Sequence, residues 1–212
     1  MVPEKRARDP ARTKADILRA AREEFCESGF NGARVDAIAE RAKANKRLLY
    51  HYYGNKEALY EAVLHDAYSE IRNGERQLSL SQHPPVEAMD RLVRFTFRHF
   101  LAHPWFPRLL AVENLQNARF LKRIKDIPAL HSPLVAELSD ILERGHASGV
   151  FRRDVDPTQL YISIAGLGYF YVSNMKTLSV IFGRDFSQFA MIQEREAQAV
   201  QMVLDYLRAG HR

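Results

Sequence analysis

Hydrophobic positions recur every three to four residues along almost the whole chain, a spacing typical of amphipathic helices. Ile17, Ala21 and Phe25 share one helical face, and Leu49 and Tyr53 lie one turn apart. No strand-like alternation persists over six residues. The pattern therefore predicts an all-α fold of about nine helices, at residues 9–30, 34–43, 45–53, 56–80, 85–103, 105–120, 132–149, 156–182 and 185–210.

Helix ends are marked by capping residues and glycines. Asp9-Pro10 has the residue types of an N-cap and a first helical position, and Ser28-Gly29 is a stop signal near the end of the first helix. Asn55 can cap the fourth helix, and Ser132-Pro133 can begin the seventh. Gly183 separates the last two.

Length and composition suit a globular protein with a real core. The 212 residues are 46% hydrophobic, enough for one large domain or a small domain joined to a larger one. The one cysteine, Cys26, excludes an intrachain disulfide and fits a reducing compartment, and no apolar N-terminal stretch resembles a signal peptide. Residues 157–175 carry no charge but include Gln159 and Asn174, which favours a buried helix over a membrane span. We therefore expect a cytoplasmic protein without a membrane partner.

The excess positive charge is confined to the first quarter of the chain. Residues 1–56 contain 13 Lys and Arg against 8 Asp and Glu, whereas the remaining residues contain 18 of each, so the net charge of +5 lies entirely in this region. A localised basic surface points to a polyanion such as nucleic acid, or to an anionic membrane. A membrane surface is the weaker alternative, because these cations alternate with acids and do not border a broad apolar stripe.

The three short N-terminal helices have the lengths of a helix-turn-helix bundle. In the third, Leu49 and Tyr53 can fasten the helix to its neighbours. The opposite side gathers cations and rings that can contact bases or phosphates, and its N-terminal turn aims backbone N–H groups outward. A charge run on a short helix can also be merely a solvated face. The candidate contact residues on this helix are Asn45, Lys46, Arg47, Tyr50 and His51.

Residues 17–63 resemble the DNA-binding domain of the TetR family of bacterial transcriptional regulators. The matching features are A-A-x-x-x-F in the first helix, Gly29-Phe30, Ile38-Ala39, Leu49-Tyr50 and the run 55–59, N-K-E-A-L. The L-L-Y form of the third helix is similar to the RutR-like branch. The resemblance implies a helix-turn-helix domain at residues 1–56 and a helical ligand-binding and dimerisation domain at 57–212. It also implies a homodimer that reads double-stranded, palindromic operator DNA.

Carried over by position, the resemblance assigns Lys46, Arg47, Tyr50 and His51 to bases and phosphates, and Lys56 to a phosphate. Arg34 stands where the family often has a capping threonine, so we expect it to reach the DNA backbone instead. Lys43 stands where glycine is frequent, and Ala44 replaces the usual valine. The expected DNA-binding set is Arg34, Lys43, Asn45, Lys46, Arg47, Tyr50, His51 and Lys56.

The C-terminal part should pair subunits and sense a signal. Stripes of apolar and small residues on the last two helices suit a four-helix dimer interface, although the same stripes could be ordinary core. Aromatic and polar residues on the middle helices could wall a small-molecule effector pocket, although core packing explains such rings equally well. The expected interface residues are Tyr161, Ala165, Gly168, Val172, Ile192, Val200, Val203 and Leu207. The expected ligand residues are Phe95, Trp105, Phe106, Glu113, Asn114, Asn117 and Phe170.

Other classes of function are disfavoured by what the sequence lacks. It contains no Gly-rich phosphate loop, zinc signature or G-x-S-x-G elbow, so no enzyme, metal or cofactor is expected. His99 and His103 are one helical turn apart, but no cysteine or carboxylate is in register with them to complete a metal site. A helical interaction protein, or a regulator without an effector, remains an alternative. The favoured function is a DNA-binding regulator, most often a repressor in this family, released by a small molecule.

Overall fold

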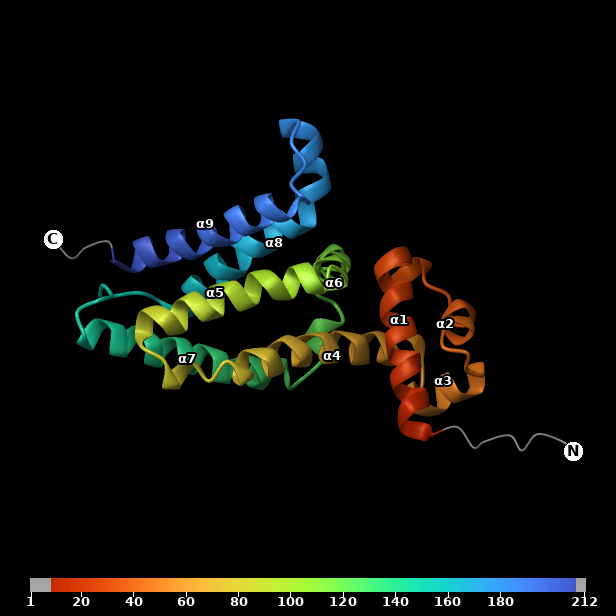
Figure 1. The fold of residues 1–212 in the computed structure, drawn as a ribbon. Coiled ribbons are helices and arrows are strands. Elements are labelled where there is room, and N and C mark those ends of the chain that lie inside the picture. Colours follow the sequence, from red (N-terminus) through yellow and green to blue (C-terminus); the bar gives the residue numbers. More distant parts are fainter. Residues whose placement is uncertain (1–8, 209–212) are drawn as a thin grey trace, which may run out of the picture. The chain divides into compact units, whose positions relative to one another are not determined.

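The computed structural model of the chain describes residues 9–208, and within them the fold is entirely helical (Figure 1). For this described part of the chain, the expectation of an all-α fold of about nine helices is confirmed. None of these helices is long and apolar enough to cross a membrane. Short 3-10 turns follow α4 and α6, at Leu80–Gln82 and Leu121–Arg123. The α-helices are α1 (Pro10–Gly32), α2 (Val35–Arg41), α3 (Lys46–Tyr53), α4 (Lys56–Gln77), α5 (Pro85–Ala102), α6 (Trp105–Leu115), α7 (Ile127–Ala147), α8 (Pro157–Phe182) and α9 (Phe189–Arg208).

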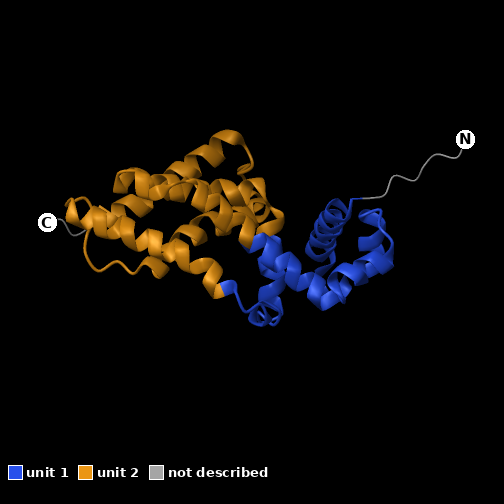
Figure 2. Cartoon of the chain, turned by 90° about the horizontal axis from the view of Figure 1, so that it is seen from below, with its two compact units in different colours: residues 1–68, 108–127 blue, residues 69–107, 128–212 orange. Residues whose placement is uncertain are grey.

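The chain forms two compact units, coloured separately in Figure 2. Unit 1 contains the chain up to Tyr68 together with Arg108–Ile127, and unit 2 contains Ser69–Pro107 and the chain from Pro128 onward. Helices α4 and α6 therefore each contribute to both units. The DNA-binding domain expected from the sequence, residues 1–56, is the larger part of unit 1.

Unit 1 is built around a cluster of aromatic rings. Phe25 and Phe30 of α1 meet Tyr60 of α4, with ring centroids 4.8 and 5.3 Å from the tyrosine. Phe120, from the segment after α6, completes the cluster at 4.3 Å from Phe30 and 5.0 Å from Tyr60. All four side chains are buried, so the 108–127 segment is part of the core that supports the helix-turn-helix.

Unit 2 has α5 packed against both α8 and α9, with α7 contributing to the same buried cluster. Small residues allow close approach at two points. A Cβ atom on Gly145 of α7 would overlap the fully buried ring of Phe151, and Gly168 of α8 faces Phe97 and Phe100 of α5. These contacts fix the inward faces of α7 and α8.

Most predicted helix ends are confirmed by capping geometry. Asp9 accepts a hydrogen bond from the Ala11 N–H at 3.0 Å, and Asn55 accepts one from the Ala58 N–H at 2.8 Å. Gly29 leaves the helical conformation with φ 66°, and Gly183 ends α8 with φ 62°.

The predicted start of the seventh helix was wrong. Helix α7 begins at Ile127 and carries Pro133 inside it, not at its first position. Ser132 does not cap it but donates to the Pro128 carbonyl, one turn earlier. Leu130, in the extra turn, lines a small cavity together with Arg72 and Glu75 of α4, so the extra turn lies next to α4. The sixth helix is also shorter than expected, because Asn117 and Ala118 both take left-handed conformations with φ 55°.

Candidate nucleic-acid interface

The start of α2 is positioned by a buried carboxylate. Arg34 precedes α2 and makes no side-chain cap, as the sequence indicated. Its backbone N–H donates instead to Glu24 Oε1 of α1 at 3.1 Å, while Glu24 Oε2 lies 3.2 Å from the Arg41 guanidinium at the far end of α2. Glu27 also pairs with Arg41. The α1 carboxylates therefore hold both ends of α2, a role that helical periodicity did not reveal.

The turn between α2 and α3 is tight and includes a left-handed residue. Lys43 has φ 50°, which explains why glycine suits this position. The Ala44 N–H donates to the Ala39 carbonyl at 2.9 Å and closes the turn. Asn45 then caps α3 by accepting from the Arg47 N–H at 2.8 Å. The side-chain oxygen of Asn45 is thus already used to cap α3, whether or not the residue also contacts DNA.

One side of α3 is fastened to α1, as predicted. Leu49 is fully buried, and the Tyr53 hydroxyl donates to the Lys14 carbonyl at 3.0 Å. Burial raises the pKa of Tyr53 to about 12, so the hydroxyl keeps its proton and its hydrogen bond throughout the physiological range. These two contacts set the rotation of α3 about its own axis.

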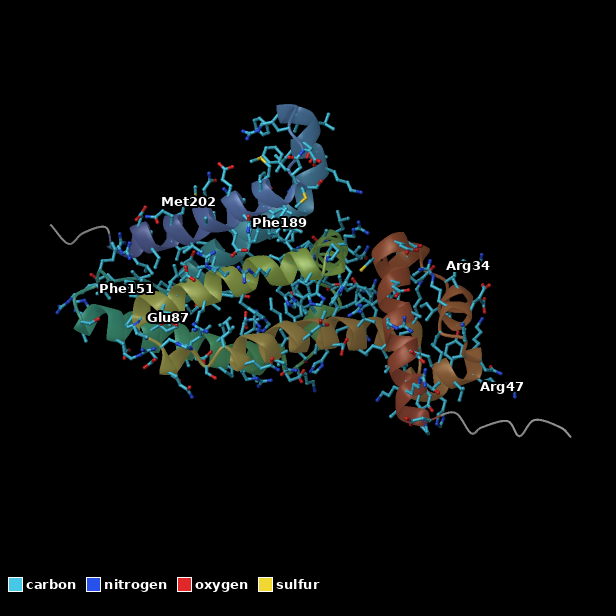
Figure 3. All side chains as sticks on the ribbon, viewed as in Figure 1. Arg34, Arg47, Glu87, Phe151, Phe189 and Met202 are labelled. Atoms are coloured by element: carbon cyan, nitrogen blue, oxygen red, sulfur yellow. The ribbon has the colours of Figure 1, made fainter. Side chains whose placement is uncertain are left out.

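The other side of α3 is turned to solvent. Lys46, Arg47, Tyr50 and His51 are all exposed, as are Arg34, Lys43 and Asn45 (Figure 3 labels Arg34 and Arg47). Lys46 Nζ lies 2.8 Å from Asp36 Oδ1 of α2. Hydrogen bonding to this carboxylate raises the pKa of Lys46, so the side chain is a firmly charged cation. The surface combines cations, a phenol and an imidazole above a rigid support, as groove recognition requires.

Lys56, at the first turn of α4, is half-buried and differs from the other candidates. Its Nζ lies 4.8 Å from the centroid of the Phe30 ring and 3.5 Å from the Asn31 carbonyl oxygen. The aliphatic stem is thus held against unit 1 while the ammonium stays near the surface. This placement is compatible with a phosphate contact at the N-terminus of α4.

Two known families match the chain. Residues 17–63 match the family described as bacterial regulatory proteins, tetR family, and residues 85–203 match the tetracyclin repressor-like C-terminal domain. The second match alone covers more than half of the chain. The chain belongs to the TetR family. It is a DNA-binding transcriptional regulator and not an enzyme.

Similar proteins agree with this assignment. The HTH-type transcriptional repressor NicS of Pseudomonas putida is 38% identical over 182 residues, 86% of each chain. The HTH-type transcriptional regulator RutR of Escherichia coli is more distant, at 25% over 96% of this chain and 94% of its own. Among solved structures, the putative transcriptional regulator SCO4942 of Streptomyces coelicolor superimposes with a TM-score of 0.67 and 25% identity over 92% of this chain and 98% of that chain.

In this TetR-family chain the expected effector residues are divided between the units. Glu113, Asn114 and Asn117 belong to unit 1, whereas Phe95, Trp105, Phe106 and Phe170 belong to unit 2. Glu113 is 3% exposed, and its Oε1 accepts from the N–H groups of Phe120 and Leu121 at 2.9 and 2.8 Å. These backbone contacts satisfy Oε1, whereas Oε2 is buried without a hydrogen-bond partner among the described residues. Asn114 and Asn117 are exposed.

The aromatic candidates of unit 2 gather around one histidine. The His99 ring lies 5.8 Å from Phe95 and 5.6 Å from Phe106, and Trp105 contacts Phe106. Phe170 does not join this group and is 58% exposed on α8. The His99 and His103 rings are 4.5 Å apart, but residues 9–208 contain no group of three or more side chains that could hold a metal ion.

Most of the residues of α8 and α9 that were expected at the dimer interface are buried or half-buried within unit 2. Val200, Val203 and Leu207 lie in the core cluster of unit 2, and Gly168 packs on α5. Tyr161 is half-buried, and its hydroxyl accepts a hydrogen bond from Arg72. Ala165, Val172 and Ile192 are half-buried too. Other apolar residues of the same two helices are exposed: Ile162, Phe170, Val180, Ile181, Phe182, Phe189, Met202 and Tyr206.

Proposed function

We propose that this regulator acts as a homodimeric repressor that reads a palindromic operator through α3 and is released by a small-molecule effector. The observation that carries the proposal is the two-sided character of α3. Leu49 and Tyr53 fix one side of this short helix to α1, and the cations and rings of the other side are left exposed. Proteins similar to this chain are described as transcriptional repressors, which supports repression as the outcome.

In the proposed complex, α3 enters the major groove as the recognition helix. Arg47 and Lys46 can donate to guanine edges or phosphates, and Tyr50 can contact a sugar, a phosphate or a thymine methyl group. Arg34 and Lys56 stand at the first turns of α2 and α4, where backbone N–H groups also favour phosphate. Lys46 must exchange its ion pair with Asp36 for a contact with DNA, which makes Asp36 a modulator of affinity.

The proposed dimer uses the exposed faces of α8 and α9. Between them lies a groove of about 500 Å³, lined by Leu160, Gly166, Phe170, Met202 and Tyr206 among others. The exposed apolar side chains that line this groove support its use as an interaction site. Gly166 has open space above it, so a helix of a second copy can approach closely.

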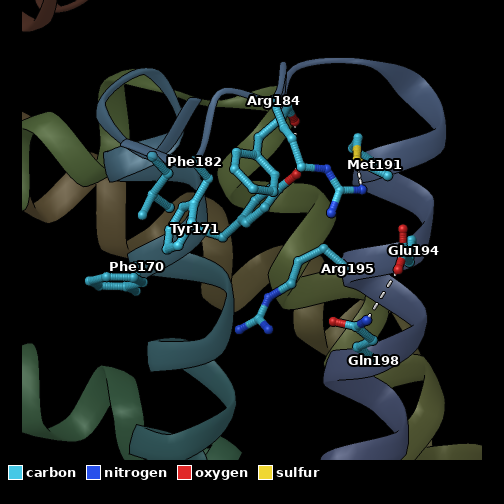
Figure 4. Close-up of a pocket in the computed structure, with 10 residues that line it drawn as sticks. Phe170, Tyr171, Phe182, Arg184, Met191, Glu194, Arg195 and Gln198 are labelled. Carbon is cyan, nitrogen blue, oxygen red and sulfur yellow. Dashed lines mark hydrogen bonds between the residues drawn. The ribbon is translucent and has the colours of Figure 1, made fainter. Parts of the chain in front are cut away.

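The same face continues to the end of α8. A second hollow of about 330 Å³ lies there, lined by Phe170, Phe182, Phe186, Met191 and Arg195 among others. Figure 4 shows its labelled side chains, with Phe170 and Phe182 on one side and Met191 and Arg195 on the other. Phe170 and Arg195 line both hollows, which makes the surface continuous. A twofold axis through this face pairs identical patches, and the same symmetry matches an inverted repeat in the operator.

The test of DNA reading is selection of bound duplexes from a random pool, followed by titration of the recovered sequence. Lys46→Ala and Tyr50→Ala should weaken binding roughly tenfold each, as expected for losing about 1–3 kcal/mol per base contact. Lys125→Ala, which removes an exposed cation outside the helix-turn-helix, is the matched control and should bind within about twofold of wild type. Salt-sensitive binding with no consensus would contradict the proposal.

The dimer is tested by sedimentation of Phe170→Glu, with Lys176→Glu on an exposed position of the same helix as control. Phe170→Glu should shift the protein to monomers and abolish tight binding to the inverted repeat, because a charge would be buried in an apolar interface. Lys176→Glu should remain dimeric. If Phe170→Glu sediments as a dimer, the interface lies elsewhere.

A further inference from the structure

Unit 2 buries a charged cluster that the DNA-binding function does not use. Arg72 and Glu75 of α4 are 4% and 1% exposed, and Arg72 Nε lies 3.0 Å from Glu75 Oε2. Arg72 Nη2 donates to the Tyr161 hydroxyl of α8. Removing charges from water costs several kcal/mol per ion even when they are paired, and an apolar pair of similar size is often as stable. Stability alone is therefore a weak reason for this cluster.

Polar atoms in the cluster lack partners. Arg72 Nη1, Glu75 Oε1 and His99 Nε2 are buried without a hydrogen-bond partner among residues 9–208. Buried polar atoms in natural proteins are nearly always satisfied by protein, water or ligand, since each orphan costs about 1–3 kcal/mol. A guanidinium edge, a carboxylate oxygen and an imidazole nitrogen thus remain available to another molecule.

The surroundings suit a flat molecule. Arg72 Cζ lies 5.0 Å from the centroid of the Tyr161 ring, and the His99 ring stacks obliquely near Phe95 at 5.8 Å. Phe95 lies directly against Gly74, where any Cβ atom would overlap its ring. The cavity beside Arg72 and Glu75 has only about 10 Å³, room for roughly one water molecule. A ring can therefore bind here only if side chains around the cluster move apart.

We propose that the Arg72–Glu75 cluster is the recognition point of the effector site and that it takes a small planar organic carboxylate. The inference rests on the proposed effector response and specifies its chemistry. Arginine is the side chain best matched to a planar carboxylate, because its N–H groups form a rigid fork. Arg72 Nη1 supplies the free edge of that fork, and Tyr161 and His99 supply ring faces.

The charge balance in the cluster favours an anion over a neutral ligand. Burial raises the pKa of Glu75 to about 7, with Arg72 opposing the shift and Glu137 of α7 adding to it. The Glu75 carboxyl can therefore take up a proton at little cost in free energy. The Arg72 guanidinium is then free to form its ion pair with the ligand. A protonated Glu75 also gains a donor that can hold the second carboxylate oxygen.

The decisive measurement is calorimetric titration of the full-length protein with benzoate and with benzamide, which have nearly the same shape but differ in charge. Benzoate should bind saturably and at least about tenfold more tightly than benzamide, since a hydrogen bond to a charged group is worth about 1.5–3 kcal/mol. Equal binding of the two, or no saturable binding of either, would overturn the proposal. This comparison uses the wild-type chain, so it does not depend on whether a variant folds.

Two arginine variants locate the site. Arg72→Gln should weaken benzoate binding about 10–100-fold, whereas Arg91→Gln, which changes an exposed arginine of α5 that pairs with Glu87, should leave it unchanged. Benzoate binding that survives Arg72→Gln would place the carboxylate elsewhere. If the protein selects an inverted-repeat operator but does not bind benzoate, only the inference about the effector site is wrong. If it binds benzoate but selects no operator, the proposed reading of operator DNA is wrong instead.

Discussion

Glu113 provides a quantitative test of the connection after α6. Its Oε1 accepts two backbone hydrogen bonds, from Phe120 at 2.9 Å and from Leu121 at 2.8 Å. The carboxylate is therefore the fixed point of the irregular segment that contains Asn117 and Ala118 with positive φ. It also keeps the fully buried Phe120 ring in contact with Phe30 and Tyr60.

The expected cost of removing this carboxylate follows from the two bonds. A hydrogen bond to a charged group is worth about 1.5–3 kcal/mol, and an orphaned buried N–H adds its desolvation penalty. Leu121 is half-buried, so its N–H regains some hydration when the bond is lost. We expect Glu113→Ala to lower the free energy of unfolding by about 3–5 kcal/mol and Glu113→Gln, which keeps a neutral acceptor, by about 1–2 kcal/mol.

Urea unfolding followed by far-UV circular dichroism measures both values. The matched control is Asn114→Ala, which changes the exposed neighbour of Glu113 and should stay within about 0.5 kcal/mol of wild type. If Glu113→Ala unfolds within about 1 kcal/mol of wild type, the carboxylate does not hold the turn. In that case, binding of an effector would be a better explanation for the burial of Glu113 than support of the turn.

Two further perturbations probe unit 2. Gly145→Ala should destabilise the protein by about 1–3 kcal/mol in thermal or urea unfolding, because the new Cβ atom overlaps the buried Phe151 ring. The control is Gly32→Ala, whose Cβ atom makes only an ordinary van der Waals contact and should change the free energy of unfolding little. Burial, assisted by the neighbouring charges of His103 and Arg72, lowers the pKa of His99 to about 4. The unfolded chain therefore binds a proton at this histidine at higher pH than the folded chain, so stability is complete above pH 6.5 and falls as the pH drops toward 4. His99→Phe should reduce that loss by about 2–3 kcal/mol in unfolding free energies compared at pH 7 and pH 4. An unchanged pH profile would show that folding does not lower the pKa of His99.

The helix-turn-helix could be predicted because its signals are local. Asp9, Asn45 and Asn55 cap helices through side chains within three residues of their targets, and Leu49 is the only large aliphatic residue of α3 that is fully buried. The sequence could not reveal Glu24 as the support of α2. Its partners Arg34 and Arg41 are 10 and 17 positions away, and in the sequence a buried acid of this kind cannot be told from an exposed acid on the same helix. The position of Pro133 was predicted wrongly for a related reason: the turn before it, with Leu130, lies next to α4, and local sequence rules do not report such tertiary neighbours.

The last two helices show a deeper limit of periodicity. Helix α8 is apolar on nearly every side, so its pattern does not say which face meets the protomer and which meets a second copy. In α9, Val203 is buried in the core while Met202, its neighbour in sequence, is 51% exposed. A rotation of about 100° per residue separates these two roles, and both positions are equally apolar. The core face is identified by Gly168 packing on α5 and by Val200 and Val203 in the buried cluster. In the proposed dimer, the exposed positions Phe170 and Met202 face the second subunit. Phe170→Glu, and not a change at Val203, therefore tests dimerisation separately from folding.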